Sequence, residues 1–388
     1  MATLAPLELL PSWQLPDAIP GSVEIGIVER DWRALDNPAA MIRWDALAQW
    51  AAEPNPFYES WYLLSALRVF APDGEIKLLC LEAGGQLAGV LPVRRSAGYY
   101  GHPVPHLANW LHGNAFVGTP LVAKGFERVF WRELLAWCDG QPGGSLFLHL
   151  AQIPVGGPLH TALVGVLGEQ DRANATVMEE ERALLCSDLD PEAYLEGSLS
   201  AKKRKELRRQ HRRLAEEGPL TVERVEGRDH LAEWTEEFLA LEKAGWKGRN
   251  GSALARDDRT TALFRDALMG AALRDRLERL AIRLDGKPLA MLATFLCSPG
   301  AFSFKTAFDE SFARYSPGVL LQRENLELLS RADIAWVDSC AAENHPMIDH
   351  FWRERRTVAR LNIAIGGKAR RLLFRALAAR ETGGRRAA

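Results

Sequence analysis

The sequence predicts an α/β fold built from two copies of one unit, and three observations support this. The length of 388 residues corresponds to two domains at roughly 100–200 residues each. The composition, 47% apolar and 25% charged, is typical of a folded globular chain. An internal repeat aligns LLCLEAGGQLAGVLPV with LAIRLDGKPLAMLATF at an offset near 202, and LFLHLAQIPVGGPL with AWVDSCAAENHPMI at an offset of 189. The alternative is two unrelated α/β domains that share a common order of hairpins and helices.

The first unit is predicted over residues 23–170, after a proline-rich lead-in at 1–22. Gly84-Gly85 between two apolar runs predicts a β-hairpin. Its strands are expected at 76–82 and 87–94, with further strands at 23–29, 114–122 and 145–152. Apolar periodicity predicts helices at 38–51, 57–70, 126–138 and 157–167.

The second unit is predicted over residues 175–365, and the join lies near 168–190. Asp285-Gly286 predicts a second hairpin with strands at 280–284 and 288–296. Further strands are expected at 301–308 and 334–339, and helices at 317–331 and 346–352. A helical insertion at 191–273 precedes the hairpin, with helices at 191–217, 228–243 and 257–273 and the loop GWKGRNGSAL at 245–254.

The cysteines and the N-terminal residues indicate a compartment. Five scattered cysteines without a Cys-x-x-Cys pair fit neither a disulfide framework nor a zinc ribbon, so a reducing cytoplasm is expected. The first residues lack a basic start followed by an apolar run, so no signal peptide is expected. No run approaches the ~18–20 apolar residues that span a bilayer. A cytoplasmic protein, or one that sits peripherally at the inner membrane, is therefore expected.

Three segments of the second unit carry a family resemblance. They are SFKTAFDESFARYSPGVLLQRENLELL (303–329), VDSCAAENHPMIDHFWRERR (337–356) and EKAGWKGRNGSAL (242–254). They resemble the GNAT-type acyltransferases of the CelD/BcsL class, which are relatives of the Fem aminoacyltransferases. The resemblance implies tandem GNAT-like units, each a mixed central sheet flanked by helices. It also implies that the second unit transfers an acyl group from acyl-coenzyme A and that the first, degenerate unit binds the acceptor.

Direct acyl transfer requires a held donor, a polarised carbonyl and an amine without its extra proton. For the donor phosphates, the strand ending at residue 308 leads into the run Arg314, Tyr315, Ser316, Pro317, Gly318 and Val319. Ser316 is expected to cap the next helix, and Gly318 leaves room for an anion at the helix N-terminus. In GNAT folds this junction holds the pyrophosphate of coenzyme A, but here the usual pattern retains one glycine. An ordinary capped helix is the alternative.

Lys305 and Asp309 are the first two candidate catalytic residues. They are four residues apart on a predicted strand and its exit, which places them on one face. Lys305 stands among Phe302, Phe304 and Phe308, where an unpaired charge is costly. We expect Lys305 to bind the acyl donor or to stabilise the tetrahedral oxyanion. A Lys305–Asp309 ion pair that only fixes the strand is the alternative.

Asp338, Glu343 and His345 are the candidate acid–base residues. Asp338 interrupts the apolar strand IAWVDSC, and the following loop carries Glu343 and His345 at the end of a strand, where α/β sheets place their chemistry. His345 would accept the proton of the amine, oriented by Asp338 or Glu343. Alternatively, His345 caps the helix that follows. Cys340 is expected to be a buried small side chain rather than a nucleophile.

Trp246 and Lys247 lie in the loop at 245–254, where an aromatic ring beside a cation would suit a lid over a phosphate or an acyl chain. A surface loop anchored by Trp246 is the alternative. Three histidines crowd into GHPVPHLANWLHG, but their spacing does not define a zinc site, so no metal is expected. Neighbouring apolar residues could instead line a groove for the acceptor: Trp110, Leu111, Phe116 and Val117.

Two basic segments contrast with a net charge of −2. Residues 202–213 carry eight Lys or Arg against one Glu, and such a helix would attract anionic lipid, the phosphates of coenzyme A or RNA unless it is simply a solvated surface. The tail at 366–388 contains ARRLLFRALAAR, a basic amphipathic helix that would lie in a membrane interface or dock on the core.

These features favour an N-acyltransferase that moves an acyl group, preferably long-chain, from acyl-coenzyme A to an amine. A long-chain amino alcohol such as a sphingoid base would make it a bacterial lipid N-acyltransferase similar to a ceramide synthase. Small-molecule or lipid substrates and contact with an anionic membrane are expected partners, and nucleic acid is not. The alternatives are acylation of an exopolysaccharide or cellulose-related substrate, Fem-like transfer from charged tRNA, and a non-catalytic scaffold.

Overall fold

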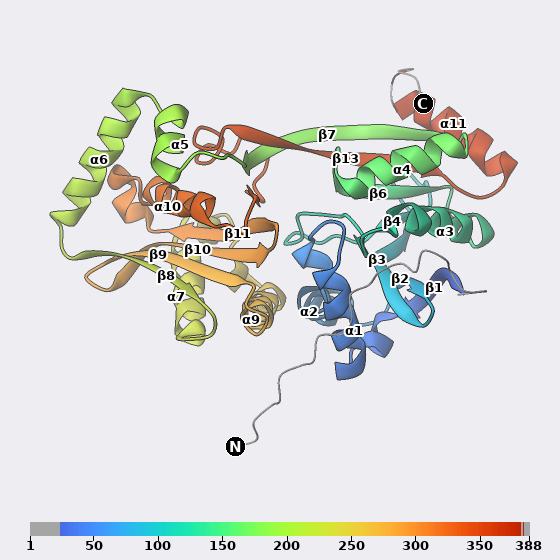
Figure 1. Ribbon diagram of the computed structural model, residues 1–388, viewed down its shortest axis with the longest axis horizontal. Coiled ribbons are helices and arrows are strands. Elements are labelled where there is room, and N and C mark those ends of the chain that lie inside the picture. Colours follow the sequence, from blue (N-terminus) through green and yellow to red (C-terminus); the bar gives the residue numbers. More distant parts are fainter. Residues whose placement is uncertain (1–23, 382, 384–388) are drawn as a thin grey trace.

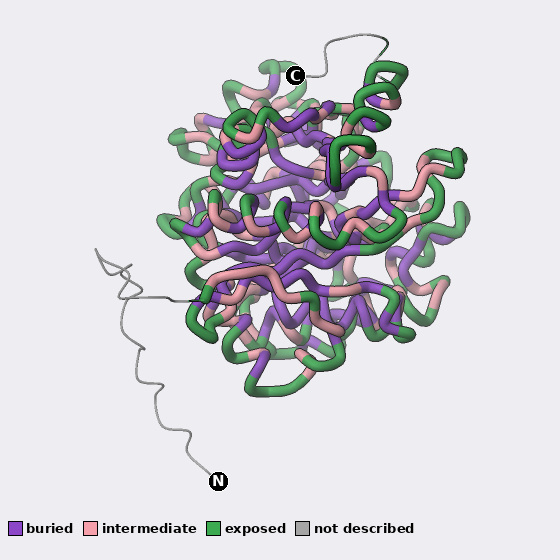
Figure 2. Tube along the Cα trace, turned by 90° about the vertical axis from the view of Figure 1, so that its right-hand side faces the viewer, coloured by how far each residue is buried: buried purple, intermediate pink, exposed green. Residues whose placement is uncertain are grey.

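The computed structural model describes residues 24–381 and 383, and the lead-in predicted at 1–22 lies outside the described residues. The two halves of the chain lie side by side, and two long strands run across both (Figure 1). Buried residues run through the middle of the molecule, whereas exposed residues follow its outer helices and turns (Figure 2). The predicted fold, a mixed sheet flanked by helices, is confirmed.

The first half is built around the predicted hairpin, in which Gly84 and Gly85 have φ of 56° and 77°, values that glycine adopts without strain. Its strands are β1 (Ile25–Asp31), β2 (Lys77–Ala83), β3 (Gln86–Ser96), β4 (His106–Asn109), β5 (Leu121–Val122) and β6 (Phe147–Pro154). Its helices are α1 (Pro38–Gln49), α2 (Ser60–Phe70), α3 (Glu127–Gly140) and α4 (Pro158–Glu169), with 3-10 turns at Trp32–Leu35 and Pro56–Tyr58.

The second half repeats the hairpin at Asp285-Gly286. Its strands are β8 (Leu220–Glu226), β9 (Leu277–Leu284), β10 (Lys287–Cys297), β11 (Gly300–Phe308) and β12 (Trp336–Asp338). Its helices are α5 (Pro191–Ser198), α6 (Ala201–Ala215), α7 (Leu231–Ala244), α8 (Trp246–Arg249), α9 (Asp258–Ala272) and α10 (Pro317–Asn325). Shorter 3-10 turns lie at Leu254–Arg256, Glu310–Tyr315 and Leu326–Ser330.

Two strands that the sequence analysis missed join the halves into one sheet. They are β7 (Asn174–Leu185) and β13 (Glu354–Ala364), which pair antiparallel along most of their length. β13 also pairs with β6 of the first half, and β7 pairs with β12 of the second half. The sheet therefore runs β1-β2-β3-β4-β6-β13-β7-β12-β11-β10-β9-β8, with β5 on β3. The tail at 366–388 begins as α11 (Lys368–Glu381), which docks through Phe374 and Ala378.

Several predicted elements were wrong in type or length. The strand expected at 114–122 is mostly a loop. Its Gly118 N–H donates to the carbonyl of Gln152 on β6, and its Gly118 carbonyl accepts from the Asn109 amide, so the segment crosses the end of β6 and does not pair along it. The helix expected at 191–217 is broken after Ser198, and the Ser200 hydroxyl accepts a bond from the Lys203 N–H as α6 begins. The insertion expected to be helical contains β8, and residues 346–352 form turns.

The halves pack against each other through α2 and α9. A Cβ on Gly270 would lie 2.9 Å from the Cβ of Trp61, so the two helices meet closely. Trp61 contacts the ring of Phe295 on β10 with centroids 5.0 Å apart. Two ion pairs flank this contact, Arg274 with Asp45 at 2.7 Å and Arg276 with Glu59. One continuous apolar core therefore includes residues of both halves.

Candidate functional site

A gap in the sheet forms the candidate site. β11 and β12 run parallel but pair only over Gly300–Phe302 and Trp336–Asp338. β11 continues to Phe308, so among the described residues 303–308 have no strand partner on this side. The chain after β12 turns away, with Cys340 in the left-handed region at φ 52°. Along this edge the Thr306 carbonyl accepts a bond from Lys247 Nζ at 2.9 Å, and the other backbone groups of 303–308 lack a strand partner among the described residues and are available to a ligand.

Asp338 holds the loop that lines this gap. Its side chain is fully buried, and Oδ2 accepts hydrogen bonds from Arg182 Nη2 at 2.7 Å and Arg356 Nη1 at 2.8 Å. Oδ1 accepts a bond from the Cys340 N–H at 2.9 Å. Burial raises the pKa of Asp338, but the two guanidinium groups outweigh it and the net pKa is lowered. Asp338 is thus a positioning carboxylate, and its predicted contact with His345 is not formed.

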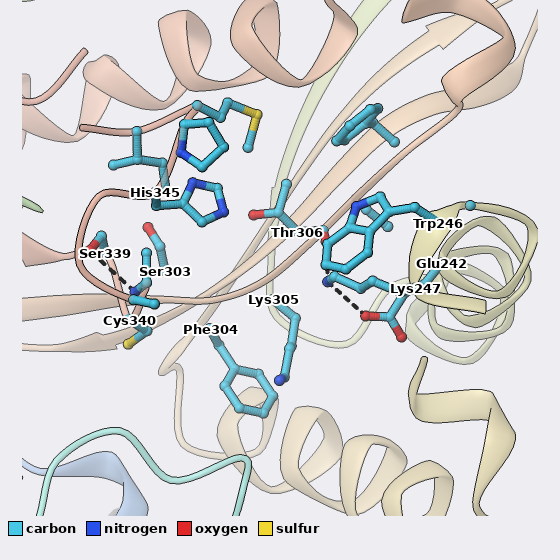
Figure 3. A pocket seen from close by; sticks show the side chains of 18 of the residues that line it. Glu242, Trp246, Lys247, Ser303, Phe304, Lys305, Thr306, Ser339, Cys340 and His345 are labelled. Atoms are coloured by element: carbon cyan, nitrogen blue, oxygen red, sulfur yellow. Dashed lines mark hydrogen bonds and ion pairs between the residues drawn. The ribbon is translucent and has the colours of Figure 1, made fainter. Parts of the chain in front are cut away.

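A cavity of about 510 Å³ opens in the gap, lined by β11, the loop after β12, α7, α8 and one residue of the first half, Phe116. Figure 3 shows the side chains of Lys305 and Phe304 on one side of β11 and the His345 ring on the other, facing Ser303 and Thr306. The sequence analysis had placed Phe116 in an apolar groove for the acceptor, and the structure places it in this cavity. Trp110, Leu111 and Val117 instead pack in or against the core.

Lys305 lies in this cavity without a charged partner. Its ammonium forms no ion pair or hydrogen bond with the described residues, and it lies 5.1 Å from the ring centroid of Phe116 and 5.5 Å from that of Phe304. Burial, together with the like charge of Lys247, lowers the pKa of Lys305 to about 8. The group is therefore mainly a cation at pH 7 and half-neutral at pH 8.

The predicted Lys305–Asp309 ion pair is absent, which corrects that alternative. The Asp309 carboxylate accepts bonds from the N–H and O–H of Ser311 at 2.8 and 2.6 Å, so it caps the turn at Glu310–Tyr315. Asp309 bonds to the backbone and side chain two residues ahead, which are nearer to its carboxylate than Lys305 is, as is common for aspartate at the start of a turn. Asp309 does not line the cavity.

His345 is half-buried in the cavity wall. Its Nδ1 is buried and has no hydrogen-bond partner among the described residues. The Oγ of Ser303, which also lines the cavity, is likewise buried and without a partner there. Burial lowers the pKa of His345, so the ring is neutral and able to accept a proton at pH 7. The backbone carbonyl of His345, not its side chain, accepts the bonds of the following turn. Glu343 is exposed and lies outside the cavity.

Cys340 also lines the cavity, and its thiol is buried. Burial raises its pKa well above the ordinary value, which keeps the thiol protonated. This agrees with the expectation of a small buried side chain.

Lys247 and Trp246 occupy the other wall. Lys247 Nζ donates to Glu242 Oε1 and to the carbonyl of Thr306, both at 2.9 Å, so it clamps α8 onto β11 and is not free for a phosphate. Trp246 stands at the rim with 45% of its surface exposed, and its backbone N–H donates to Glu310 Oε1 at 2.6 Å. A covering role for Trp246 remains a prediction.

The expected phosphate site at the start of α10 differs from its prediction. Ser316 has φ 52°, and its side chain makes no capping bond; its hydroxyl accepts from Gln210 at 3.2 Å. The N–H groups of Val319 and Leu320 donate to the carbonyl of Ser316, both at 3.0 Å. A Cβ on Gly318 would lie 2.6 Å from the sulfur of Met347, so this glycine permits close packing against the cavity wall.

Arg314 and Tyr315 both contact Glu217, Arg314 at 3.1 Å. The Gly318 N–H donates to no backbone carbonyl of the described residues, and the half-buried Val319 packs against the apolar core of the second half.

The corresponding gap of the first half is closed. β4 and β6 also run parallel and pair only at Leu107–Leu148 and Ala108–His149. The Asn109 amide bonds the carbonyls of Gly118 and Ala151 at 3.1 and 3.0 Å, and its oxygen accepts from the Ala151 N–H at 2.8 Å. The Gly118 N–H donates to the carbonyl of Gln152 at 2.8 Å. The chain itself therefore fills this gap.

The three histidines of GHPVPHLANWLHG have separate surroundings. His102 is exposed, His106 stacks on Phe147, and the half-buried His112 stacks on Tyr62. Within 24–381 and 383, no three His, Cys, Asp or Glu side chains gather as a metal site. In the same residues, no helix is long and apolar enough to cross a bilayer. Arg182 and Arg356 were missed, because nothing in their local sequence marks the carboxylate that they share.

Comparison with known proteins agrees with this geometry. Residues 201–346 match the family described as acetyltransferase (GNAT) domain. No curated protein matches the chain. The fold is similar to the crystal structure of FemX, with TM-score 0.54, 11% identity, and coverage of 87% of this chain and 98% of that one. A conserved protein of unknown function from Bacteroides thetaiotaomicron gives TM-score 0.55, 10% identity, and coverage of 87% and 99%. The family match indicates a GNAT-type acyltransferase, and the structural likenesses show the fold.

Proposed function

We propose that this chain is an N-acyltransferase that moves a long acyl group from a thioester such as acyl-coenzyme A to an amine. The observation that carries the proposal is the open gap beside β11, where an unpaired Lys305 and a neutral His345 line one cavity within the matched acetyltransferase domain. The closed gap of the first half supports transfer in the second half alone, with the first half contributing Phe116 to the acceptor side.

The groups on the cavity wall can perform each part of the reaction. The free edge of β11 can hydrogen-bond the amide groups of a pantetheine arm as a further strand would. The Lys305 ammonium stabilises the oxyanion that forms when the amine attacks the thioester carbonyl. His345, on the other side of β11, accepts through water the proton that the amine loses. The C–N bond forms, the C–S bond breaks, and the departing thiolate takes up the proton.

The lining supports a lipid-like substrate. The side chains that face the gap include Phe116, Leu241, Phe304, Phe308 and Ile348, which would pack against methylene groups. We therefore favour a long-chain amino alcohol as acceptor, which would give an amide lipid, and a place in the CelD/BcsL class.

Thiol release tests this function. Purified protein is given acetyl- or palmitoyl-coenzyme A, with and without sphinganine, and free thiol and amide product are measured. We expect release only with palmitoyl-coenzyme A and the amine together. Lys305→Met should reduce kcat at least ~100-fold, because it removes the cation at the oxyanion. Lys287→Met, at an exposed turn, is the matched control.

Three results would count against this proposal. Transfer of acetyl alone would exclude the long-chain donor. No release under any condition would exclude a coenzyme A thioester. Full activity of Lys305→Met would exclude the role of Lys305.

A further inference from the structure

One face of α6 carries a dense, unneutralised positive charge. Leu207 and Leu214 are buried against the second half, and the opposite face is exposed. Among the described residues, Arg209 pairs with Glu206 at 2.6 Å and Arg212 lies 4.0 Å from Glu216. The other exposed cations of this face form no ion pair within the described part of the chain: Lys202, Lys203, Lys205, Arg208 and Arg213. Such a surface attracts an anionic partner.

This face, which we call the α6 basic face, lies on the outer side of a helix whose covered side contacts the segment that leads into α10. Gln210 donates to the Ser316 hydroxyl at 3.2 Å, and Glu217, just after α6, holds Arg314 and Tyr315. Two residues after Ser316, Gly318 packs against Met347, which is part of the cavity wall. Figure 1 shows α6 at the outer end of the second half, close to α5 and α10. A partner on the α6 basic face would therefore be separated from this segment by about the width of one helix.

The phosphate-binding groups at the start of α10 are few. The N–H groups of Val319 and Leu320 are used by Ser316, and Glu217 engages Arg314. Coenzyme A carries a pyrophosphate and a ribose phosphate, whereas a pantetheine arm attached to a protein carries a single phosphodiester. The start of α10 thus uses two of its N–H groups internally, and a single phosphodiester needs fewer such groups than a nucleotide does.

The chemistry of the α6 basic face also selects among anionic partners. None of the large exposed apolar side chains of the described residues lies on α6, so the helix has nothing to insert into a bilayer. RNA binding requires basic surface spread along many phosphates. Here the cations occupy one helix with Glu196, Glu216 and Glu217 nearby, in a chain of net charge −2. One basic helix face is complementary to one acidic helix of a small protein.

We propose that the α6 basic face docks an acidic acyl carrier protein, which delivers the acyl group to the cavity on its phosphopantetheine arm. This inference rests on the proposed function and names the donor's carrier. The arm enters beside α10, the C–S bond to its sulfur breaks as the C–N bond forms, and the carrier leaves with a free thiol.

Competing donors test the proposal in the full-length protein. Amide formation from sphinganine is measured with palmitoyl-acyl carrier protein and with palmitoyl-coenzyme A, for the wild type and for Lys202→Glu/Lys205→Glu/Arg208→Glu. We expect the KM for the carrier-bound donor to rise at least tenfold in the variant, and the wild-type KM for this donor to rise with added salt, because the contact is ionic. The KM for palmitoyl-coenzyme A should change less than twofold. Lys368→Glu/Arg375→Glu/Arg380→Glu, on exposed positions of α11, is the matched control and should change neither value.

Each other outcome overturns the proposal and has a distinct meaning. An equal rise in KM for both donors would mean that the face binds coenzyme A or that the substitutions impair folding. Thermal unfolding of the variant separates these two explanations. Use of palmitoyl-coenzyme A with no use of the carrier-bound donor leaves the N-acyltransferase function intact and removes the carrier. Activity only with an aminoacyl-tRNA, lost in the α6 variant, would assign the face to RNA. No product from either donor would remove the proposed function itself.

Discussion

Lys305 and His345 share one cavity, and burial shifts both pKa values downward, which has opposite consequences for their charges. Burial lowers the pKa of Lys305 to about 8, so it is still mainly charged at pH 7. Burial also lowers the pKa of His345 from an ordinary value near 6.5, so it is neutral there. A cation and a neutral base therefore coexist between the two values, which is the combination that thioester aminolysis requires.

This pair predicts a bell-shaped pH dependence. The value of kcat/KM should rise as pH increases through the lowered pKa of His345, because the ring must lose its proton to act as a base. It should fall above about pH 8, where Lys305 loses its charge. Initial rates from pH 5 to 10, in wild type and Lys305→Arg, measure this. Arginine stays charged over that range, so the descending limb should disappear. A wild-type rate that rises through pH 8 would assign the base role to Lys305.

At this scale the sequence showed some site residues and concealed others. Lys305 could be identified from the sequence because a lysine among phenylalanines in a strand is costly to bury without a partner or a ligand. Asp338 was visible as a polar interruption, but its role was not, because Arg182 comes from a strand 156 residues away. Asp309 was assigned to the site by its spacing, yet the nearby Ser311 satisfies its carboxylate first.

Strands and turns decide which of the two sheet gaps is open. Beyond Phe302, none of the described strands pairs with β11 on the β12 side, whereas between β4 and β6 the loop around Gly118 crosses the gap and is held by Asn109. A Cβ on Gly118 would lie 2.0 Å from the carbonyl oxygen of Ala151, so only glycine permits this crossing. Two residues earlier, the same loop presents Phe116 to the open cavity. The loop that closes the gap of the first half therefore also positions Phe116 in the wall of the open cavity.

Gly118→Ala should test that link. The added methyl must displace the loop from β6, which should cost about 1–3 kcal/mol of unfolding free energy. Because Phe116 moves with the loop, the KM for the amine acceptor should rise several-fold. Urea unfolding and acceptor titrations measure the two effects. Gly113→Ala is the matched control, because a Cβ there would meet nothing within 4 Å. Equal behaviour of the two variants would contradict the account.

Local signals predicted the hairpins and most helices, and long-range pairing accounts for the errors. Gly84-Gly85 and Asp285-Gly286 fix their turns through their own backbone preferences. β13 was missed because its partners, β6 and β7, lie about half a chain away and its outward positions are charged. Residues 114–122 carry strand-like side chains, but Gly118 and Pro120 favour a loop that crosses the sheet end.

The whole molecule is one sheet rather than two separable units. β13, near the end of the chain, lies between β6 of the first half and β7, so each half completes the other. The apolar core likewise continues from α2 of the first half to α9 of the second. The repeat in the sequence indicated two similar units, but it could not indicate that a late strand returns to the first.

This arrangement predicts that the first half does not fold alone. A chain cut after residue 172 lacks β13 and α11, which leaves the edge of β6 unpaired and Phe147 uncovered. We expect no cooperative thermal unfolding and association on a sizing column. A monomer of residues 1–172 that unfolds cooperatively near the temperature of the intact protein would contradict this.

The central claim is that the acyl donor binds along the free edge of β11. Backbone hydrogen exchange measures this directly, with and without a thioether analogue of palmitoyl-coenzyme A that cannot transfer its chain. The account predicts slower exchange at residues 303–308 and in the loop at 339–348, and no change in β6, where the gap is closed. Unchanged exchange at 303–308 with saturating analogue, or protection centred on β6, would contradict it.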